Sequence, residues 1–364
     1  MTEQKLDKNL ITEKIDLLAK NLSNIKDETG EYLLNFNGLI VDDKSWHVWN
    51  WPQGVGLYGL FAYYKFTQNK DAKSILDEWF NQRILEGSPP KNVNTMAPLL
   101  AMAFLYEEGN NNYRPYLEQW ADWVMYDMPR TEENGLQHMT YSSVHDGQLW
   151  ADTLMMSVLP LAKIGLLLNK PEYVEDAKKQ FLIHTKYLAD KKTGLWFHGW
   201  NFNGHHNYAN ALWGRGNCWA TISIPEIIDI LNLKPGDHMY DFLVSTLNRQ
   251  IKTLKELQDD SGMWHTLLDH PDSYLESSAT AGFAFGILKG IRKRYVSKEF
   301  LPVAEKAIRA IINNINDDGA VENVSVGTGL AEDLNYYKSI KVTTMPYGQS
   351  LAILALTEYL YTFA

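Results

Sequence analysis

The 364-residue sequence contains one cysteine, Cys218, so no disulfide can form within the chain. No run of about 18 apolar residues occurs, which excludes a typical membrane-spanning helix. The opening residues, MTEQKLDKNL, are charged and contain no apolar core, unlike a secretory signal peptide. Together these absences predict a cytoplasmic protein, from a reducing compartment, that does not enter a membrane.

Positive charge is also scarce. Lysine and arginine number 34 against 44 aspartate and glutamate residues, which gives a net charge of −10. This balance argues against broad binding to nucleic acid or to an anionic membrane. The sequence has no glycine-rich phosphate loop, and no HExxH motif or Cys/His spacing accompanies the neighbouring histidines His198, His205 and His206. We therefore expect no cofactor and no bound metal.

Helical periodicity, in contrast, is present almost throughout the chain. Helices that are apolar nearly all round are predicted at 52–68, 95–108, 148–168, 217–231, 274–293 and 344–362. More amphipathic helices are predicted at 9–25, 71–86, 113–128, 171–189, 237–257 and 297–316. The two kinds alternate with a spacing of about 60 residues per pair, which indicates an internal repeat.

Six helical hairpins with alternating burial predict an all-α fold, an (α/α)6 barrel in which six outer helices surround six inner ones. An open solenoid is the alternative, but it needs polar caps and usually has links of more even length. No linker or low-complexity segment divides the chain, so we expect residues 1–364 to form a single domain.

The links between the helices differ strongly in length. Those that leave the apolar helices are short, whereas those that enter them are long: 26–51, 87–94, 129–147, 190–216, 258–273 and 317–343. All six long links should therefore gather at one end of the ring, where loops held by a rigid scaffold usually build a site. Asn94, Asp152 and Trp219 fall at the inner-helix N-termini, whose free N–H groups suit an anionic ligand.

One carboxylate, Asp152, lies within a strongly apolar segment. Its neighbours include Trp150, Leu154 and Met155. Apolar surroundings disfavour the charged form of a carboxyl group, so the pKa of Asp152 should rise, as suits a general acid. The alternative is an ordinary N-cap aspartate, which accepts hydrogen bonds from the first turn of the helix.

The link 190–216 is rich in aromatic and basic residues. It contains His198 and Arg215 and leads directly to Trp219. An arginine can bind a carboxylate through two hydrogen bonds, and tryptophan faces can stack on sugar rings. The alternative is that Arg215 pairs with a structural acid and the tryptophans belong to the core. His138, in the preceding link, is either a loop hydrogen-bond donor or a core histidine with satisfied ring nitrogens.

Several motifs together resemble those of the unsaturated rhamnogalacturonyl hydrolases, glycoside hydrolase family 105, over nearly the whole chain. They are Trp49-Asn50-Trp51-Pro52-Gln53-Gly54-Val55, Asn92-Val93-Asn94-Thr95, Leu149-Trp150-Ala151-Asp152-Thr153-Leu154-Met155-Met156, Gly194–Trp200, Arg215-Gly216-Asn217-Cys218-Trp219 and Leu275-Glu276-Ser277-Ser278. The resemblance implies a six-hairpin (α/α) barrel, in agreement with the helix count. It also implies a substrate: a short oligosaccharide with a 4,5-unsaturated uronic acid at its non-reducing end, as lyases acting on pectin produce.

The same resemblance implies roles for individual residues. Asp152 matches the family's catalytic acid, which protonates C4 of the double bond and then helps water to add at C5, so that the resulting hemiketal falls apart and releases the neighbouring sugar. Seven further residues match positions that bind the unsaturated sugar: Trp51, Asn94, His138, Trp150, His198, Arg215 and Trp219. Family members often carry a second acid in the stretch where this chain has Asn92-Val93-Asn94, and no acid is present there.

Other functions remain open at this stage. An isomerase or epimerase on a related (α/α) barrel would use paired histidines such as His198 and His205, and a non-catalytic barrel would only bind sugar. Within the hydrolase class the leaving sugar is open. Rhamnose follows from the resemblance, whereas glucosamine-type or sulfated sugars would belong to an unsaturated glucuronyl hydrolase that acts on other lyase products. The sequence predicts no oligomeric state.

Overall fold

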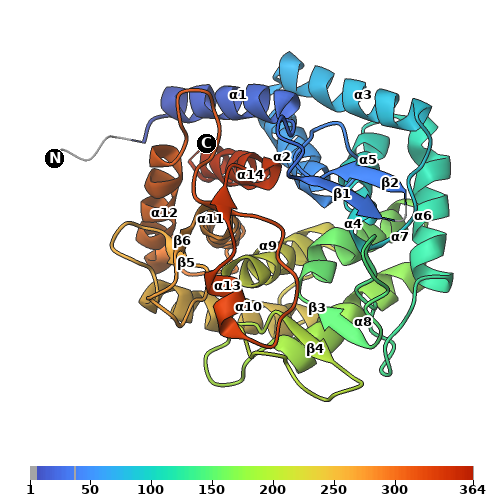
Figure 1. The fold of residues 1–364 in the computed structure, drawn as a ribbon. Helices are drawn as coiled ribbons and strands as arrows, with labels where there is room; N and C mark the ends of the chain where they lie inside the picture. The colour runs from blue at the N-terminus through green and yellow to red at the C-terminus, as the bar shows by residue number, and fades with distance from the viewer. Residues whose placement is uncertain (1–5, 37, 364) are drawn as a thin grey trace.

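The computed structural model describes residues 6–36 and 38–363 and shows a closed ring of helices (Figure 1). The inner helices are α2 (Trp51–Thr67), α4 (Val93–Met96) with α5 (Pro98–Glu107), η2 (Leu154–Val158) with α7 (Leu159–Leu167), α9 (Gly214–Ile230), α11 (Ser277–Arg292) and α14 (Pro346–Thr362). The outer helices are α1 (Lys8–Asn24), α3 (Lys70–Leu85), α6 (Arg114–Tyr126), α8 (Pro171–Leu188), α10 (His238–Glu256) and α12 (Leu301–Asn313). The predicted (α/α)6 barrel is confirmed.

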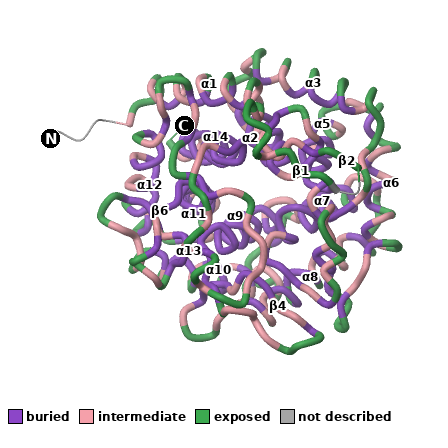
Figure 2. Tube along the Cα trace, in the orientation of Figure 1, coloured by how far each residue is buried: buried purple, intermediate pink, exposed green. Residues whose placement is uncertain are grey.

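Burial follows the alternation that the sequence predicted. The inner helices are buried along most of their length, whereas the outer helices bury one face and expose the other (Figure 2). In α1 the buried face is formed by Ile11, Ile15, Leu18 and Leu22, which recur at helical spacing. The last inner helix, α14, packs against α1, α2 and α11, so the two ends of the chain meet and close the ring. This contact is incompatible with an open solenoid.

Close packing of the inner helices depends on small residues. A Cβ atom on Gly286 of α11 would collide with the carbonyl oxygen of Thr221 in α9. A Cβ atom on Gly54 of α2 would collide with the backbone of Ala97 and Pro98. Glycine at these two positions therefore lets neighbouring inner helices approach more closely than any side chain would allow.

Short strands and helices occupy the links between the main helices. Four antiparallel pairs form: β1 (Leu33–Phe36) with β2 (Leu39–Asp42), β3 (Gln148–Trp150) with β4 (Gly199–Asn201), β5 (Trp264–His265) with β6 (Leu275–Glu276), and β7 (Val324–Ser325) with β8 (Val342–Thr343). The remaining short elements are η1 (Asn111–Tyr113), η3 (Lys298–Phe300) and α13 (Leu334–Lys338). Each strand lies in a segment that leads into an inner helix (Figure 1), and the β3–β4 pair joins two different segments of this kind.

Two predicted helix starts are wrong. The helix expected from residue 148 begins only after β3, because Gln148–Trp150 pairs with Gly199–Asn201 as extended backbone. The helix expected from residue 274 begins at Ser277, because Leu275–Glu276 pairs with Trp264–His265. In both cases pairing with another strand, distant in sequence for β3 and within the same link for β6, overrides the local apolar pattern. No helix among the described residues is long and apolar enough to cross a bilayer.

Candidate active site

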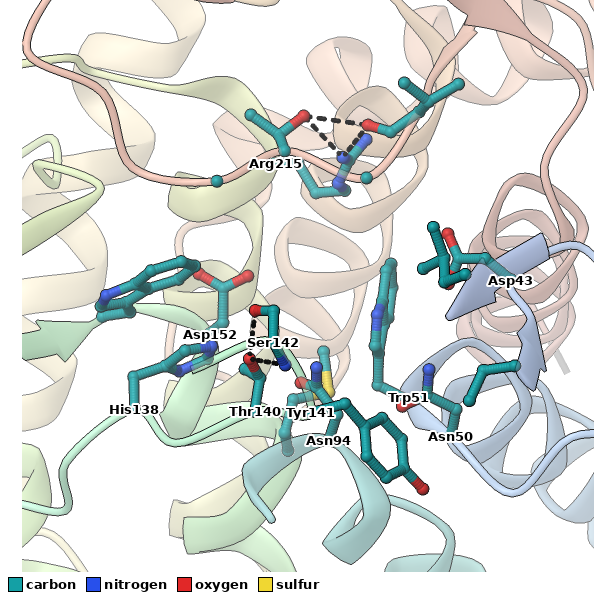
Figure 3. A pocket seen from close by; sticks show the side chains of 18 of the residues that line it. Asp43, Asn50, Trp51, Asn94, His138, Thr140, Tyr141, Ser142, Asp152 and Arg215 are labelled. Carbon is teal, nitrogen blue, oxygen red and sulfur yellow. Dashed lines mark hydrogen bonds between the residues drawn. The ribbon is translucent and has the colours of Figure 1, made fainter. Parts of the chain in front are cut away.

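The long links that enter the inner helices enclose a cavity of about 620 Å³, a size typical of a small-molecule site. Six of the eight residues predicted for the site line this cavity: Trp51, Asn94, His138, Trp150, Asp152 and Arg215. They come from four different inner-helix entrances, and Figure 3 shows Asp152, His138, Asn94, Trp51 and Arg215 around one space. The other two, His198 and Trp219, are buried behind the cavity wall.

Strand pairing places Asp152 beside His198. Trp150 of β3 lies opposite Gly199 of β4, and the amide of Ala151 donates a hydrogen bond to the carbonyl oxygen of His198 at 3.1 Å. The chain then turns into a helix whose first full turn, Leu154–Val158, is a π-helix. Such turns are rare and occur frequently at functional sites. Asp152 therefore sits at the junction between an extended segment and a wide helical turn.

The Asp152 carboxyl group is nearly without partners. Its Oδ1 accepts a hydrogen bond from Trp219 Nε1 at 3.1 Å, while its Oδ2 is buried and accepts none from the described residues. The side chain is 17% exposed, toward the cavity. Burial raises its pKa from 3.8 to about 6, against the lowering effects of its own backbone amide, of Arg215 and of Trp219. No amide of the following turn donates to it, so the N-cap alternative is not what the described structure shows.

His198 faces the unpartnered oxygen of Asp152. Its Nε2 lies 3.7 Å from Oδ2, which is too long for a hydrogen bond, and this nitrogen also lacks a partner among the described residues. Burial, together with the charge of Arg215, holds the pKa of His198 well below its usual value, so the ring is neutral. Its other nitrogen, Nδ1, lies 2.9 Å from the hydroxyl oxygen of Tyr337.

Tyr337 is placed to set which nitrogen of His198 carries the proton. Burial raises the pKa of this tyrosine, so its phenol stays protonated, and its oxygen also takes a backbone hydrogen bond from Ala331. The phenol proton is therefore free to be donated to Nδ1 of His198. In that arrangement Nε2 carries the histidine proton and points toward Asp152.

Aromatic rings form the flat walls of the cavity. His138 stacks on Trp150 with ring centroids 4.1 Å apart and planes inclined by 4°. Trp51 stacks on Tyr347 at 4.6 Å, and its edge meets Trp219 at 5.7 Å. Flat apolar faces flanked by polar groups suit the stacking of sugar rings.

His138 forms a hydrogen bond through one ring nitrogen and is also part of the cavity wall. Its Nδ1 lies 2.9 Å from Thr153 Oγ1, and burial holds its pKa well below the usual value, so the ring is neutral. Asn94 also lines the cavity. Its backbone amide donates a hydrogen bond to Asn92 Oδ1, whereas its side-chain amide makes no hydrogen bond within the described chain. The Asn94 side chain is thus available to a ligand.

Arg215 lines the cavity but is already well bound. Its Nη1 donates to Ser325 Oγ at 2.7 Å, and its Nη2 donates to the carbonyl oxygen of Val326 at 3.0 Å. Nη1 also lies 3.6 Å from the buried carboxylate of Glu276. The structural pairing considered as an alternative is therefore present, and a role in binding a substrate carboxylate stays a prediction.

Trp219 lies deeper in its helix than predicted. Helix α9 begins at Gly214, so Trp219 belongs to its second turn rather than to its N-terminus. From there its indole N–H reaches Asp152 Oδ1. The residue thus orients the carboxyl group and supports Trp51, without lining the cavity itself.

Two residues that face this region were missed. Asp43 lines the cavity from the turn after β2, and Tyr337 reaches His198 from α13. Both lie in long links that were expected to build the site, 26–51 and 317–343. The length of the links was therefore a usable signal, but no local motif distinguishes these two residues from their neighbours.

Other chemistries find little support in the described residues. No group of three or more His, Cys, Asp or Glu side chains is arranged there to hold a metal ion. Burial raises the pKa of the Cys218 thiol well above its usual value, which disfavours a thiolate nucleophile. His205 is exposed and does not line the cavity, so it does not pair with the buried His198 as the isomerase alternative requires.

The toroid and its carboxyl-bearing, aromatic-walled cavity suit a glycoside hydrolase, and the family that the chain matches shows it to be one. The chain belongs to Glycosyl Hydrolase Family 88, whose model matches residues 24–363. It is 32% identical to the unsaturated rhamnogalacturonyl hydrolase YesR of Bacillus subtilis over 86% of this chain and 90% of that protein. It is also 32% identical to an unsaturated 3S-rhamnoglycuronyl hydrolase of an Alteromonas species, but over only 47% of this chain and 42% of that protein.

Solved structures agree with the family assignment. A crystal structure of a possible member of family GH105 from Salmonella enterica serovar Paratyphi A is 52% identical, covers 100% of this chain and 97% of that chain, and superposes with a TM-score of 0.98. The resemblance drawn from the sequence motifs is confirmed.

Proposed function

We propose that this protein releases a 4,5-unsaturated uronic acid from the non-reducing end of short oligosaccharides derived from rhamnogalacturonan. The observation that carries the proposal is Asp152: a cavity-facing carboxyl group whose pKa is raised to about 6 by burial and whose Oδ2 has no partner among the described residues. Such a group can hold a proton near neutral pH and give it to a substrate atom. The names of the relatives support the substrate class.

The proposed reaction is a hydration. Protonated Asp152 gives its proton to C4 of the vinyl-ether double bond, and positive charge develops at C5, next to the ring oxygen. Water adds its oxygen at C5 and returns a proton to the Asp152 carboxylate, so the acid is regenerated. The resulting hemiketal opens, and the neighbouring sugar leaves with its glycosidic oxygen as a hydroxyl group. One protonatable carboxyl suffices, unlike the two-carboxylate route of ordinary glycosidases.

The remaining cavity residues bind and orient in this proposal. Trp51 and Trp150 offer stacking faces, and the Asn94 amide is available for sugar hydroxyl groups. Arg215 supplies the positive charge that attracts the uronate carboxylate. His198, neutral and with Nε2–H toward Asp152, stabilises the carboxylate form that appears once the proton has been transferred.

The proposal is tested with an unsaturated uronyl-rhamnose disaccharide and its saturated counterpart. The protein should erase the ultraviolet absorbance of the conjugated double bond while it releases rhamnose, and the saturated disaccharide should remain intact. Efficient cleavage of the saturated sugar would show that hydration is the wrong mechanism. Release of no sugar from any unsaturated uronide would remove the proposed function altogether.

Two further expectations are proposed with it. Residues 1–364 form one catalytic domain, as the continuous core around the described part of the ring supports. The protein is cytoplasmic, as its single cysteine supports, and fractionation of cells that express the native chain tests this directly.

A further inference from the structure

Asp43 is a cavity carboxylate, like Asp152 and Glu31, and the reaction proposed above does not use it. It follows directly after β2, and its backbone amide donates to the carbonyl oxygen of Tyr32 at 3.0 Å, which fixes its position against the start of the hairpin. Its carboxylate lines the cavity and accepts no hydrogen bond from the described residues. Burial raises its pKa to about 6, against the attraction of Arg215. An acceptor this poorly satisfied is suited to a ligand.

Asp43 and Asp152 serve different parts of the cavity. Figure 3 shows them on opposite sides of the Trp51 ring. Neither carboxyl group contributes to the pKa shift of the other. They are therefore not a coupled acid–base pair, and Asp43 does not replace the second acid that is missing at Asn92-Val93-Asn94.

The depth of the cavity indicates which sugar Asp43 meets. Around Asp152 the walls are buried, as His138 and Trp150 are. The exposed lining residues are Glu31 and Leu34 near the β1–β2 hairpin, Gly327 and Lys341 in the link 317–343, and Ser142 in the link 129–147, so these three links border the mouth. A terminal unsaturated ring placed over Asp152 must direct the rest of the oligosaccharide toward the mouth. Asp43, on the hairpin side, then lies along the path of the leaving sugar.

The mouth offers no unpaired positive charge among the described lining residues. Lys341 forms an ion pair with Glu31 at 2.6 Å, and the Arg215 guanidinium is held by Ser325 and Val326. A sulfate group on the leaving sugar would thus meet the Asp43 carboxylate without a free cation to offset the repulsion. A neutral sugar would instead donate its hydroxyl groups to that carboxylate.

We propose that Asp43 is the residue that makes this enzyme prefer a neutral leaving sugar over a sulfated one. This proposal rests on the proposed function. Among the relatives both kinds of substrate name occur, since one is a rhamnogalacturonyl hydrolase and another a 3S-rhamnoglycuronyl hydrolase. Asp43 provides a physical reason to place this chain with the first kind.

The test compares two disaccharides, an unsaturated uronic acid linked to rhamnose and the same compound with a 3-sulfate on the rhamnose. The proteins are the wild type, Asp43→Asn, Asp43→Ser and the control Glu28→Gln. Glu28 is an exposed acid in the link before the hairpin that does not line the cavity, so its variant makes the same charge change away from the mouth. Rates are measured at about pH 8, where Asp43 is ionised, and circular dichroism checks that each variant folds.

The wild type and Glu28→Gln should use the neutral disaccharide with a kcat/KM at least about tenfold above that of the sulfated one. Asp43→Asn and Asp43→Ser should lose about tenfold on the neutral disaccharide, because a charge-assisted hydrogen bond is removed, and should gain on the sulfated one. Added salt should lower the ratio of kcat/KM between the neutral and the sulfated disaccharide for the wild type, but should leave that ratio unchanged for the Asp43 variants.

Each contrary outcome has a distinct meaning. If the wild type is active but folded Asp43 variants keep the same ratio between the two disaccharides, the role of Asp43 is overturned. A wild-type preference for the sulfated disaccharide overturns it as well. If the wild type consumes no unsaturated uronide of any kind, the proposed function fails before the question of the leaving sugar arises.

Discussion

The far end of the helical ring and the surroundings of Asp152 treat charge in opposite ways, although the site end also holds one paired buried charge, Arg215 with Glu276. At the end opposite the long links, the C-terminal halves of α9, α11 and α14 and the middle of α2 carry a group of buried and half-buried polar side chains that we name the far-end charge cluster. Its members are Tyr58, Glu226, Asp229, Lys289, Arg292, Lys293 and Glu358. At the site end, Asp152 is buried with a single side-chain hydrogen bond, from Trp219.

Pairing distinguishes the two regions. In the far-end charge cluster, Lys289 lies 2.8 Å from Glu226 and 3.2 Å from Asp229, and Tyr58 donates to Glu226 at 2.7 Å. The opposite charges hold the pKa of Asp229 below and that of Lys289 above its usual value, so both stay ionised. At Asp152 burial prevails and raises the pKa to about 6. The charges of the far-end cluster are ion-paired, whereas Asp152 has no such close partner among the described residues, as suits a catalytic acid.

The largest expected effect is on turnover. Asp152→Asn keeps the shape of the side chain but has no proton to give, so kcat should fall by about 1000-fold, within the range of general acid catalysis. Substrate binding should persist, because the walls formed by Trp51 and Trp150 are untouched. Steady-state kinetics with an unsaturated disaccharide, together with equilibrium binding, measures both quantities. A folded Asn variant with near-normal kcat would remove Asp152 from the chemistry.

A matched change in the far-end charge cluster should affect stability instead. Glu226→Gln leaves Lys289 and Tyr58 with a weaker partner, so the free energy of unfolding should fall by about 3 kcal/mol. The variant that remains folded should keep a normal kcat, since the cluster lies at the other end of the ring from the cavity. Denaturant unfolding and kinetics on the same sample provide the measurement. Lost turnover with unchanged stability would contradict the division between the two ends.

The pH dependence of stability also distinguishes Asp152 from the ion-paired far-end charge cluster. The folded pKa of Asp152, about 6, lies above its ordinary value of 3.8, which corresponds to about 3 kcal/mol of preference for the neutral form. This stability is fully present below about pH 3.8 and is lost as the pH rises through 6. Asp152→Asn should therefore be more stable than the wild type by about 2–3 kcal/mol near pH 8, and equal to it near pH 3.5.

Thermal or denaturant unfolding of the two proteins across this range measures the difference. The pKa of Asp43 is also raised to about 6. Its pH-dependent contribution to the free energy of unfolding is the same in both proteins, so it cancels in the difference between them. An Asn variant less stable than the wild type at high pH would mean that the ionised Asp152 is well accommodated, contrary to its lack of partners.

The smallest expected effect on kcat comes from Tyr337, which acts on Asp152 only through His198. Tyr337→Phe removes the hydroxyl group that fixes the His198 proton, so kcat should fall by about tenfold, or about 1.4 kcal/mol, with KM nearly unchanged. Nitrogen NMR of the His198 ring should show a mixture of the two tautomers. The control is Tyr361→Phe, which also loses a phenolic hydrogen bond, to the carbonyl oxygen of Ala62, but far from the site. Equal effects of both changes would reduce Tyr337 to a structural role.

The ring and the catalytic candidate were predictable from sequence for the same reason. Alternating burial follows from helical periodicity, as in α1 and α14. Asp152 could be singled out because its chain neighbours, such as Trp150 and Met155, are apolar and buried. Asp43 and Tyr337 were not predictable, because contacts distant in sequence, Glu31 with Lys341 beside the β1–β2 hairpin and Tyr337 with His198, place them at the cavity. The binding partners of Arg215 were missed for that reason too, since Ser325 and Val326 lie about 110 residues away.

The most direct test of the central claim, that Asp152 protonates a carbon atom, is turnover in heavy water. NMR spectra of the uronic product, recorded while the wild type consumes an unsaturated disaccharide, should show one deuterium at C4 in a single configuration, and the released uronide should never carry the intact double bond. Release of a uronide that still contains the double bond, and that takes up deuterium at C4 only later and in both configurations, would contradict the account.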